Sequence, residues 1–129
     1  MKTIQDVENL EKLIGQLQGL HSEISQLAKK SPNDGLNIFK LKLVNKVLQC
    51  GNEVLAGRYI PFDDFRQFEE SDLPTNSDVT MILAQYMEQA ERFRSDHVVS
   101  HDYEWRYLVN GAPSSMASKA PTKVGGDKK

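Results

Sequence analysis

The chain has 129 residues, a formal net charge of −2, 39% hydrophobic residues and a single cysteine. This is the length of one domain, and it allows a hydrophobic core without metals or disulfides. The slightly acidic charge argues against a dedicated binder of nucleic acid or anionic membranes, and no apolar run approaches the roughly 20 residues that span a bilayer. With one cysteine and no apolar N-terminal signal, we expect a cytoplasmic protein without a membrane partner.

The first helix is predicted over residues 3–30. Thr3 and Asp6 have the spacing of a capping box. Six apolar residues then recur in steps of three and four: Leu10, Leu13, Leu17, Leu20, Ile24 and Leu27. Such a helix is about 40 Å long, whereas a body of this size has a radius of gyration of roughly 13 Å. Another long helix or a second copy of the chain should therefore cover it, and we predict a homodimer.

The second helix is predicted from Ser31, as N-cap, through Pro32 to about residue 56, where Gly57 is a stop signal. It has two apolar faces, one made of Leu36, Phe39, Leu43, Val47, Cys50 and Val54 and the other of Leu41, Val44, Leu48 and Leu55. Apolar residues on two faces are typical of the central helix of a bundle. Gly51 inside the helix indicates a close helix crossing.

Residues 58–77, called here the aromatic–acidic segment, are the most distinctive part of the chain. Its candidate residues are Tyr59, Phe62, Phe65 and Phe68, interspersed with Asp63, Asp64, Glu69 and Glu70. Phenylalanines at every third position after Pro61 predict a short helical turn with one aromatic edge. Aromatic side chains among charges are typical of protein-binding patches, so we predict that these residues bind another protein. The alternative is that the phenylalanines plug the open end of the bundle.

The third helix is predicted from Thr75 and Asp78, another capping-box spacing, to about Arg94. Residues 96–109 either continue this helix or extend, and their period-two alternation favours an extended arm. Because the arm has no evident partner strand, no sheet is predicted. Residues 111–129 are rich in Gly, Ala, Pro, Ser and Lys and are expected to form a disordered tail. The predicted fold is therefore all-α: an antiparallel bundle of three main helices over residues 1–110, a short aromatic helical turn and the tail.

His97 and His101, flanked by Asp96, Asp102 and Glu104, are the metal candidate. If this stretch is helical, the two imidazoles lie at i and i+4 on one face, and Asp102 would complete the ligands. The alternative is a polar patch near a helix end, where histidine is favoured by the helix dipole.

Two weaker candidates involve carboxylates and the thiol. Glu88 and Glu91, together with Glu69 or Glu70, would form half of a carboxylate cage for a divalent cation, but a hydrated helix face is the preferred explanation. Cys50 lies on an apolar face, where cysteine behaves as a small hydrophobic residue.

Three function classes follow, and no cofactor is predicted for the leading one. The leading class is a non-enzymatic protein–protein interaction module: a small adaptor, chaperone or inhibitor acting on a larger protein. The second is a metal-binding protein or metal-dependent hydrolase using His97, His101 and nearby carboxylates. The third, which the charge disfavours, is a nucleic-acid-linked regulator using Lys40, Lys42, Lys46 and the basic tail.

Overall fold

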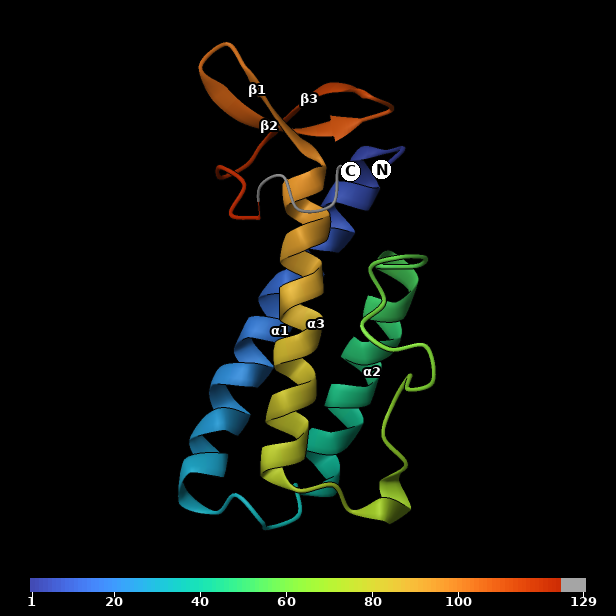
Figure 1. Cartoon of the computed structure of the whole chain (residues 1–129), viewed down its shortest axis with the longest axis vertical. Helices are drawn as coiled ribbons and strands as arrows, with labels where there is room; N and C mark the ends of the chain where they lie inside the picture. Colours follow the sequence, from blue (N-terminus) through green and yellow to red (C-terminus); the bar gives the residue numbers. More distant parts are fainter. Residues whose placement is uncertain (124–129) are drawn as a thin grey trace.

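The computed structural model describes residues 1–123 and combines a helical bundle with a small sheet (Figure 1). Within these residues the elements are α1 (Ile4–Lys30), α2 (Ile38–Val54), the 3-10 turn η1 (Glu70–Asp72), α3 (Asn76–Asp96), β1 (Val98–His101), β2 (Glu104–Val109) and β3 (Ala112–Ala117). α1 and α3 form a long antiparallel pair with α2 beside them, and the sheet sits at the end where α1 begins and α3 ends. None of the helices in residues 1–123 combines the length and the apolar character needed to cross a membrane.

The predicted starts of α1 and α3 are confirmed. The Thr3 hydroxyl accepts a hydrogen bond from the Asp6 amide, and the Asp6 carboxylate accepts one from the Thr3 amide, both at 3.1 Å. These reciprocal bonds are a complete capping box. At α3 the Thr75 hydroxyl accepts from the Asp78 amide, also at 3.1 Å.

The predicted start of α2 is wrong. Its N-cap is Asn37 rather than Ser31, and the Asn37 side chain accepts a first-turn amide at 2.9 Å. The turn between α1 and α2 instead pairs with the segment before α3, where the Leu36 N–H donates to the Pro74 carbonyl at 2.9 Å. Backbone groups paired with another segment cannot also pair within a helix.

The predicted helical turn at the phenylalanines is also wrong. Residues 61–68 are irregular, and the nearby 3-10 turn is η1. The Asn45 side chain on α2 pairs with both backbone groups of Phe68: its Nδ2 donates to the carbonyl and its Oδ1 accepts from the N–H, each at 2.9 Å. The N–H and C=O of Phe68 are therefore bonded to a side chain and not to the backbone of a helical turn.

The all-α prediction is wrong because the described C-terminal part contains a three-stranded antiparallel sheet in the order β1-β2-β3. Two-residue turns, Asp102-Tyr103 and Asn110-Gly111, join the strands, and their φ values are 52°, 66°, 53° and 77°. Positive φ at both positions is the requirement of type I′ hairpin turns. The expected extended arm forms β1 and β2, and β2 has a partner strand on each side.

Part of the predicted disordered tail is therefore ordered. β3 pairs with β2 as an edge strand, a position that tolerates Pro113 because one row of its backbone groups has no partner strand. Residues 118–123 then run back to α3, and residues 124–129 of the predicted tail lie outside the described residues.

Two groups of buried residues form the core. The larger lies between the helices and includes Leu17, Leu48, Leu83 and Tyr86, all 0% exposed. The smaller joins the start of α1 to the sheet and contains Val7, Leu10, Val98 and Tyr107. α3 and the sheet thus cover the long helix α1, so that a second copy of the chain is not needed to cover it. The homodimer stays a prediction, but the length of α1 no longer argues for it.

Candidate functional site

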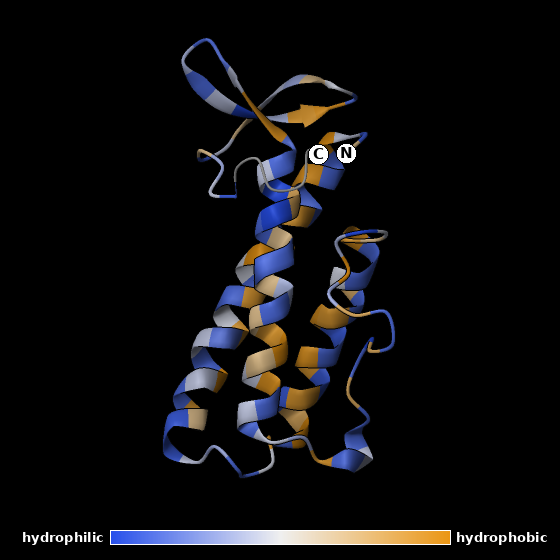
Figure 2. Ribbon diagram, in the orientation of Figure 1, coloured by the Kyte–Doolittle hydropathy of each residue, from blue (hydrophilic) through white to orange (hydrophobic). Residues whose placement is uncertain are grey.

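α2 carries two apolar faces, and within residues 1–123 the fold covers one of them fully. The covered face consists of Leu41, Val44, Leu48 and Leu55, each at most 1% exposed. On the other face Phe39 is 70% exposed, Leu43 is 38% exposed and Cys50 is exposed. Figure 2 shows apolar residues along the whole of α2. The predicted central helix therefore lies beside the α1–α3 pair, with part of its second apolar face open to solvent.

This second face forms one wall of a groove between α1 and α2. The groove has a volume of about 670 Å³, and its apolar lining consists of Leu13, Leu20, Leu43, Val47, Cys50 and Val54. On the α1 side the lining includes Gly19, beside which the position of an added Cβ has no atom within 4 Å. A small residue at this wall leaves room for a bulky apolar side chain.

The polar lining of the α1–α2 groove contains two basic side chains, one acidic side chain and the neutral amides of Asn9 and Gln16. Lys12 of α1 and Lys46 of α2 line it together with Glu53. Within residues 1–123 neither lysine has an ion-pair partner, whereas Lys40 of α2 pairs with Glu23 of α1 at 2.6 Å. Comparisons of the chain with protein-family models, curated proteins and solved structures find no match. The proposed function is therefore based on the shape and charge of the groove and of the other described residues.

The aromatic–acidic segment packs its aromatic side chains inward. Tyr59 is 8% exposed, and the three phenylalanines are partly buried against the larger core. Phe65 lies edge-on to both of the others, with ring centroids 6.4 Å from Phe62 and 5.0 Å from Phe68. The acidic candidates Asp63, Asp64, Glu69 and Glu70 are all exposed. The structure thus separates the candidate residues into an inner aromatic set and an outer acidic set, and it holds residues 66–68 along the side of α2. Partner binding by this segment stays a prediction.

Three amide side chains of α2 hold the segment, and they were missed in the sequence. Besides the Asn45 pairing with Phe68, Gln49 Nε2 donates to Gln67 Oε1 at 2.7 Å. Asn52 Nδ2 donates to the carbonyl of residue 66 at 2.9 Å. The amides lie at i, i+4 and i+7, on one side of the helix. A stripe of amides beside two apolar faces is the signal that would have identified them.

Tyr59 also ties the segment to the end of α3. Its hydroxyl donates to Asp96 Oδ2 at 2.6 Å, and Arg58 Nη2 lies 3.3 Å from the same oxygen. Burial raises the pKa of Tyr59 to about 12, and the hydrogen bond and charge of Asp96 act in the same direction. The hydroxyl is therefore a neutral donor throughout the physiological pH range.

The structure does not place the metal candidates on one helical face. His97 is the C-cap of α3, stacked on Phe93, and its Nδ1 lies 2.6 Å from the Phe93 carbonyl. Burial lowers the pKa of His97. His101 lies at the end of β1, with Nε2 3.3 Å from the carboxylate of the exposed Asp102. No group of three or more His, Cys, Asp or Glu within residues 1–123 is arranged to hold a metal ion.

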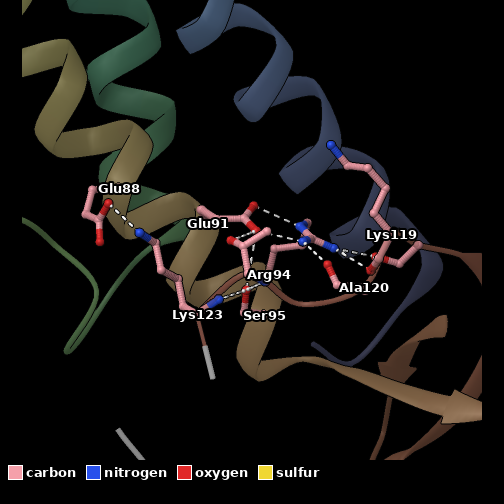
Figure 3. Close-up of polar contacts among 9 residues, drawn as sticks. Glu88, Glu91, Arg94, Ser95, Lys119, Ala120 and Lys123 are labelled. Atoms are coloured by element: carbon pink, nitrogen blue, oxygen red, sulfur yellow. Dashed lines mark hydrogen bonds and ion pairs between the residues drawn. The ribbon is translucent and has the colours of Figure 1, made fainter. Parts of the chain in front are cut away.

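Residues 118–123, called here the strap, return from β3 to α3 and bind Arg94 (Figure 3). Arg94 is 3% exposed. Its guanidinium makes two hydrogen bonds to the Glu91 carboxylate, two to Ser118 Oγ and the Lys119 carbonyl, and one to the Ala120 carbonyl, all at 2.6–2.9 Å. Arginine has five N–H donors, so these bonds use all of them.

Carboxylates of α3 complete the attachment of the strap. Burial by itself raises the pKa of Glu91, but hydrogen bonds from Arg94 and Thr122 outweigh it and lower the pKa to about 2. Glu88 pairs with Lys123 Nζ at 2.9 Å. The two carboxylates considered as half of a metal cage thus hold the strap. They also border a second groove of about 450 Å³ between α1 and α3, where their charges are already paired.

Proposed function

We propose that the protein is a non-enzymatic interaction module whose α1–α2 groove binds an amphipathic helix of another protein. The observation that carries this proposal is the second apolar face of α2, which no other described element covers fully. Large apolar side chains exposed next to an apolar groove are typical of protein interaction sites. A helix laid into a groove between two helices is a common mode of peptide recognition.

The dimensions of the groove suit a helix. α2 has 17 residues, which corresponds to about 25 Å of helix, long enough to contact roughly four turns of a partner. Phe39 and Leu43 lie one turn apart at the edge of the groove, and each presents apolar surface that a partner would bury. Fully burying such a side chain contributes about 1.5–3 kcal/mol, so their exposed fractions contribute roughly 2–3 kcal/mol together. Since association itself costs at least about 4 kcal/mol, the other apolar residues that line the groove have to supply the rest of the binding free energy.

The lone thiol agrees with a cytoplasmic location for this function. Cys50 is exposed and lines the groove. An exposed unpaired thiol persists most readily in a reducing compartment, and we infer that the module acts there.

A designed peptide tests the proposal without a known partner. The probe is a fluorescent 18-residue helix with leucines at i, i+3, i+4 and i+7 repeats and uncharged glutamine and alanine elsewhere. We expect saturable binding by fluorescence anisotropy. Leu43→Asp should weaken it at least tenfold, because a charge then enters an apolar groove. The matched control is Met81→Asp on α3, which changes an apolar residue that is 56% exposed and does not line the groove.

Two results would contradict the proposal. One is the absence of saturable binding by a protein whose circular dichroism shows the native helical content. The other is an equal loss of affinity in Leu43→Asp and Met81→Asp, since that outcome indicates unspecific adhesion of the peptide to exposed apolar residues.

A further inference from the structure

We infer that the helix bound in the α1–α2 groove is acidic on both sides of its apolar stripe. This inference rests on the proposed function and adds the chemistry of the partner. Lys12 enters the groove lining from α1, and Lys46 enters it from α2. A helix lying between α1 and α2 therefore meets a lysine on each side.

Neither of these lysines has a carboxylate within ion-pair distance among residues 1–123, which is also true of exposed lysines outside the groove such as Lys42. Lys40 pairs with Glu23 and Lys123 pairs with Glu88. Among the described residues that line the groove, Glu53 is the single carboxylate beside the two lysines. The groove is thus locally basic on a chain whose net charge is −2. Carboxylates on a partner supply the missing charges, and the lysine stems extend the apolar walls.

A second copy of this chain fits the groove less well than an acidic helix. The outer stripe of α2 has Phe39, Leu43, Lys46, Cys50 and Glu53 at helical spacing, with Lys46 at its midpoint. In a two-fold dimer the same patch faces itself. Pairing the full stripe, parallel or antiparallel, places Lys46 opposite its own copy. Like charges in contact across an interface are unfavourable.

Three matched peptides test the charge of the partner. Each has the same leucine stripe, flanked on both sides by glutamate, glutamine or lysine. In 50 mM salt we expect affinity to fall from the glutamate to the glutamine to the lysine peptide. The first and last should differ roughly tenfold, as expected when two exposed attractive pairs become repulsive. The difference should fall below about twofold in 1 M NaCl, where charges are screened within about 3 Å.

Charge reversal on the protein identifies the groups responsible. The double variant Lys12→Glu/Lys46→Glu should invert the order of the three peptides. The matched control, Lys29→Glu, changes an exposed lysine in the last turn of α1, outside the groove, and should retain the original order. Circular dichroism confirms that each variant is folded.

The outcomes separate this inference from the proposed function. Equal, saturable binding of all three peptides, lost in Leu43→Asp, would overturn the acidic partner and leave the helix-binding groove in place. Failure of every peptide to bind would overturn both. Sedimentation equilibrium should show the same oligomeric state for the wild type and Leu43→Asp at 100 µM. A dimer that Leu43→Asp dissociates would overturn the acidic partner in favour of a second copy.

Discussion

Replacing Arg94 with Met removes the group that holds the strap while keeping a long unbranched side chain. Arg94 is 3% exposed, so the stem stays packed while all five donors are lost. The change leaves the Glu91 carboxylate without its guanidinium. Ser118 Oγ and the carbonyls of Lys119 and Ala120 also lose the donor that joins the strap to α3.

The pKa of Glu91 sets the size of the expected effect. The fold lowers this pKa from 4.5 to about 2, and each pKa unit corresponds to about 1.4 kcal/mol, so the shift amounts to about 3 kcal/mol. Because the Glu91 side chain is 26% exposed, water screens part of this interaction. Removing one partner of a buried ion pair destabilises proteins by about 3–5 kcal/mol. We therefore expect Arg94→Met to reduce the free energy of unfolding by about 3 kcal/mol.

Urea denaturation followed by circular dichroism measures this loss, and hydrogen exchange locates it. The amides of Thr122 and Lys123 donate to Ser95 Oγ at 3.1 and 3.2 Å, so their exchange should accelerate more than that of the larger core. Lys42→Met, at an exposed position of α2, is the control. A loss below about 1 kcal/mol, or unchanged exchange at residues 122 and 123, would refute the role assigned to the guanidinium.

The same ion pair predicts a pH dependence. Because the folded pKa of Glu91 lies below its ordinary value, its stabilisation is fully present above pH 4.5 and is lost as the pH falls through about 2. Glu91→Gln should therefore be less stable than the wild type by about 2 kcal/mol at pH 6 and nearly equal to it at pH 2. A stability difference that does not change between these pH values would contradict the assignment.

Four further substitutions test the packing, each by urea denaturation. Gly111→Val, at a φ of 77°, should destabilise the protein by about 1–2 kcal/mol, and an unchanged stability would contradict the tight hairpin turn. Asn45→Ala should remove about 2 kcal/mol because both backbone groups of Phe68 lose their partner, and a loss below about 0.5 kcal/mol would contradict that role. In Gly51→Ala the new Cβ would lie 3.1 Å from a buried tyrosine ring of α3, so we expect a loss of about 1 kcal/mol. Gly15→Ala, with open space around the Cβ, should gain about 0.5–1 kcal/mol, and equal effects of the two glycine changes would contradict the close crossing.

Local signals predicted the helices where side chain and backbone interact within a few residues. Thr3 and Thr75 predicted the starts of α1 and α3 because each hydroxyl accepts a hydrogen bond from an amide in the first turn of its own helix. Ser31 and Pro32 have equally good start signals, yet the following turn pairs with the segment before α3. Leu36 and Pro74 are 38 residues apart in the sequence, so local spacing contains no information about the pairing.

The sheet was missed for a different reason. Asn110-Gly111 is a strong hairpin signal, because both residues adopt positive φ readily. The composition of the following residues obscured it: β3 contains Ala, Pro and Ser and buries little apolar surface. β3 is held by backbone pairing with β2 and by the hydrogen bonds of Arg94 to the strap that follows it. Neither contact can be predicted from amino-acid composition.

The sequence indicated a protein-binding site at the aromatic–acidic segment, whereas the proposed groove lies between α1 and α2. The aromatic–acidic segment attracted attention because its aromatic residues are numerous, and the structure packs them inward. The two apolar faces of α2 were visible in the sequence, but a second face is equally consistent with a buried central helix. Deciding between burial and exposure required the position of α2 beside the α1–α3 pair, which depends on packing across the whole bundle.

Protection of Cys50 tests the helix-binding groove most directly. This thiol is the single cysteine of the chain, is exposed and lines the groove, so the native protein carries its own reporter. With the glutamate-flanked peptide at ten times its Kd, the rate of Cys50 modification by a thiol reagent should fall about tenfold, in proportion to the unbound fraction. Saturable binding of the peptide with an unchanged rate at Cys50 would place the bound helix elsewhere and contradict the account.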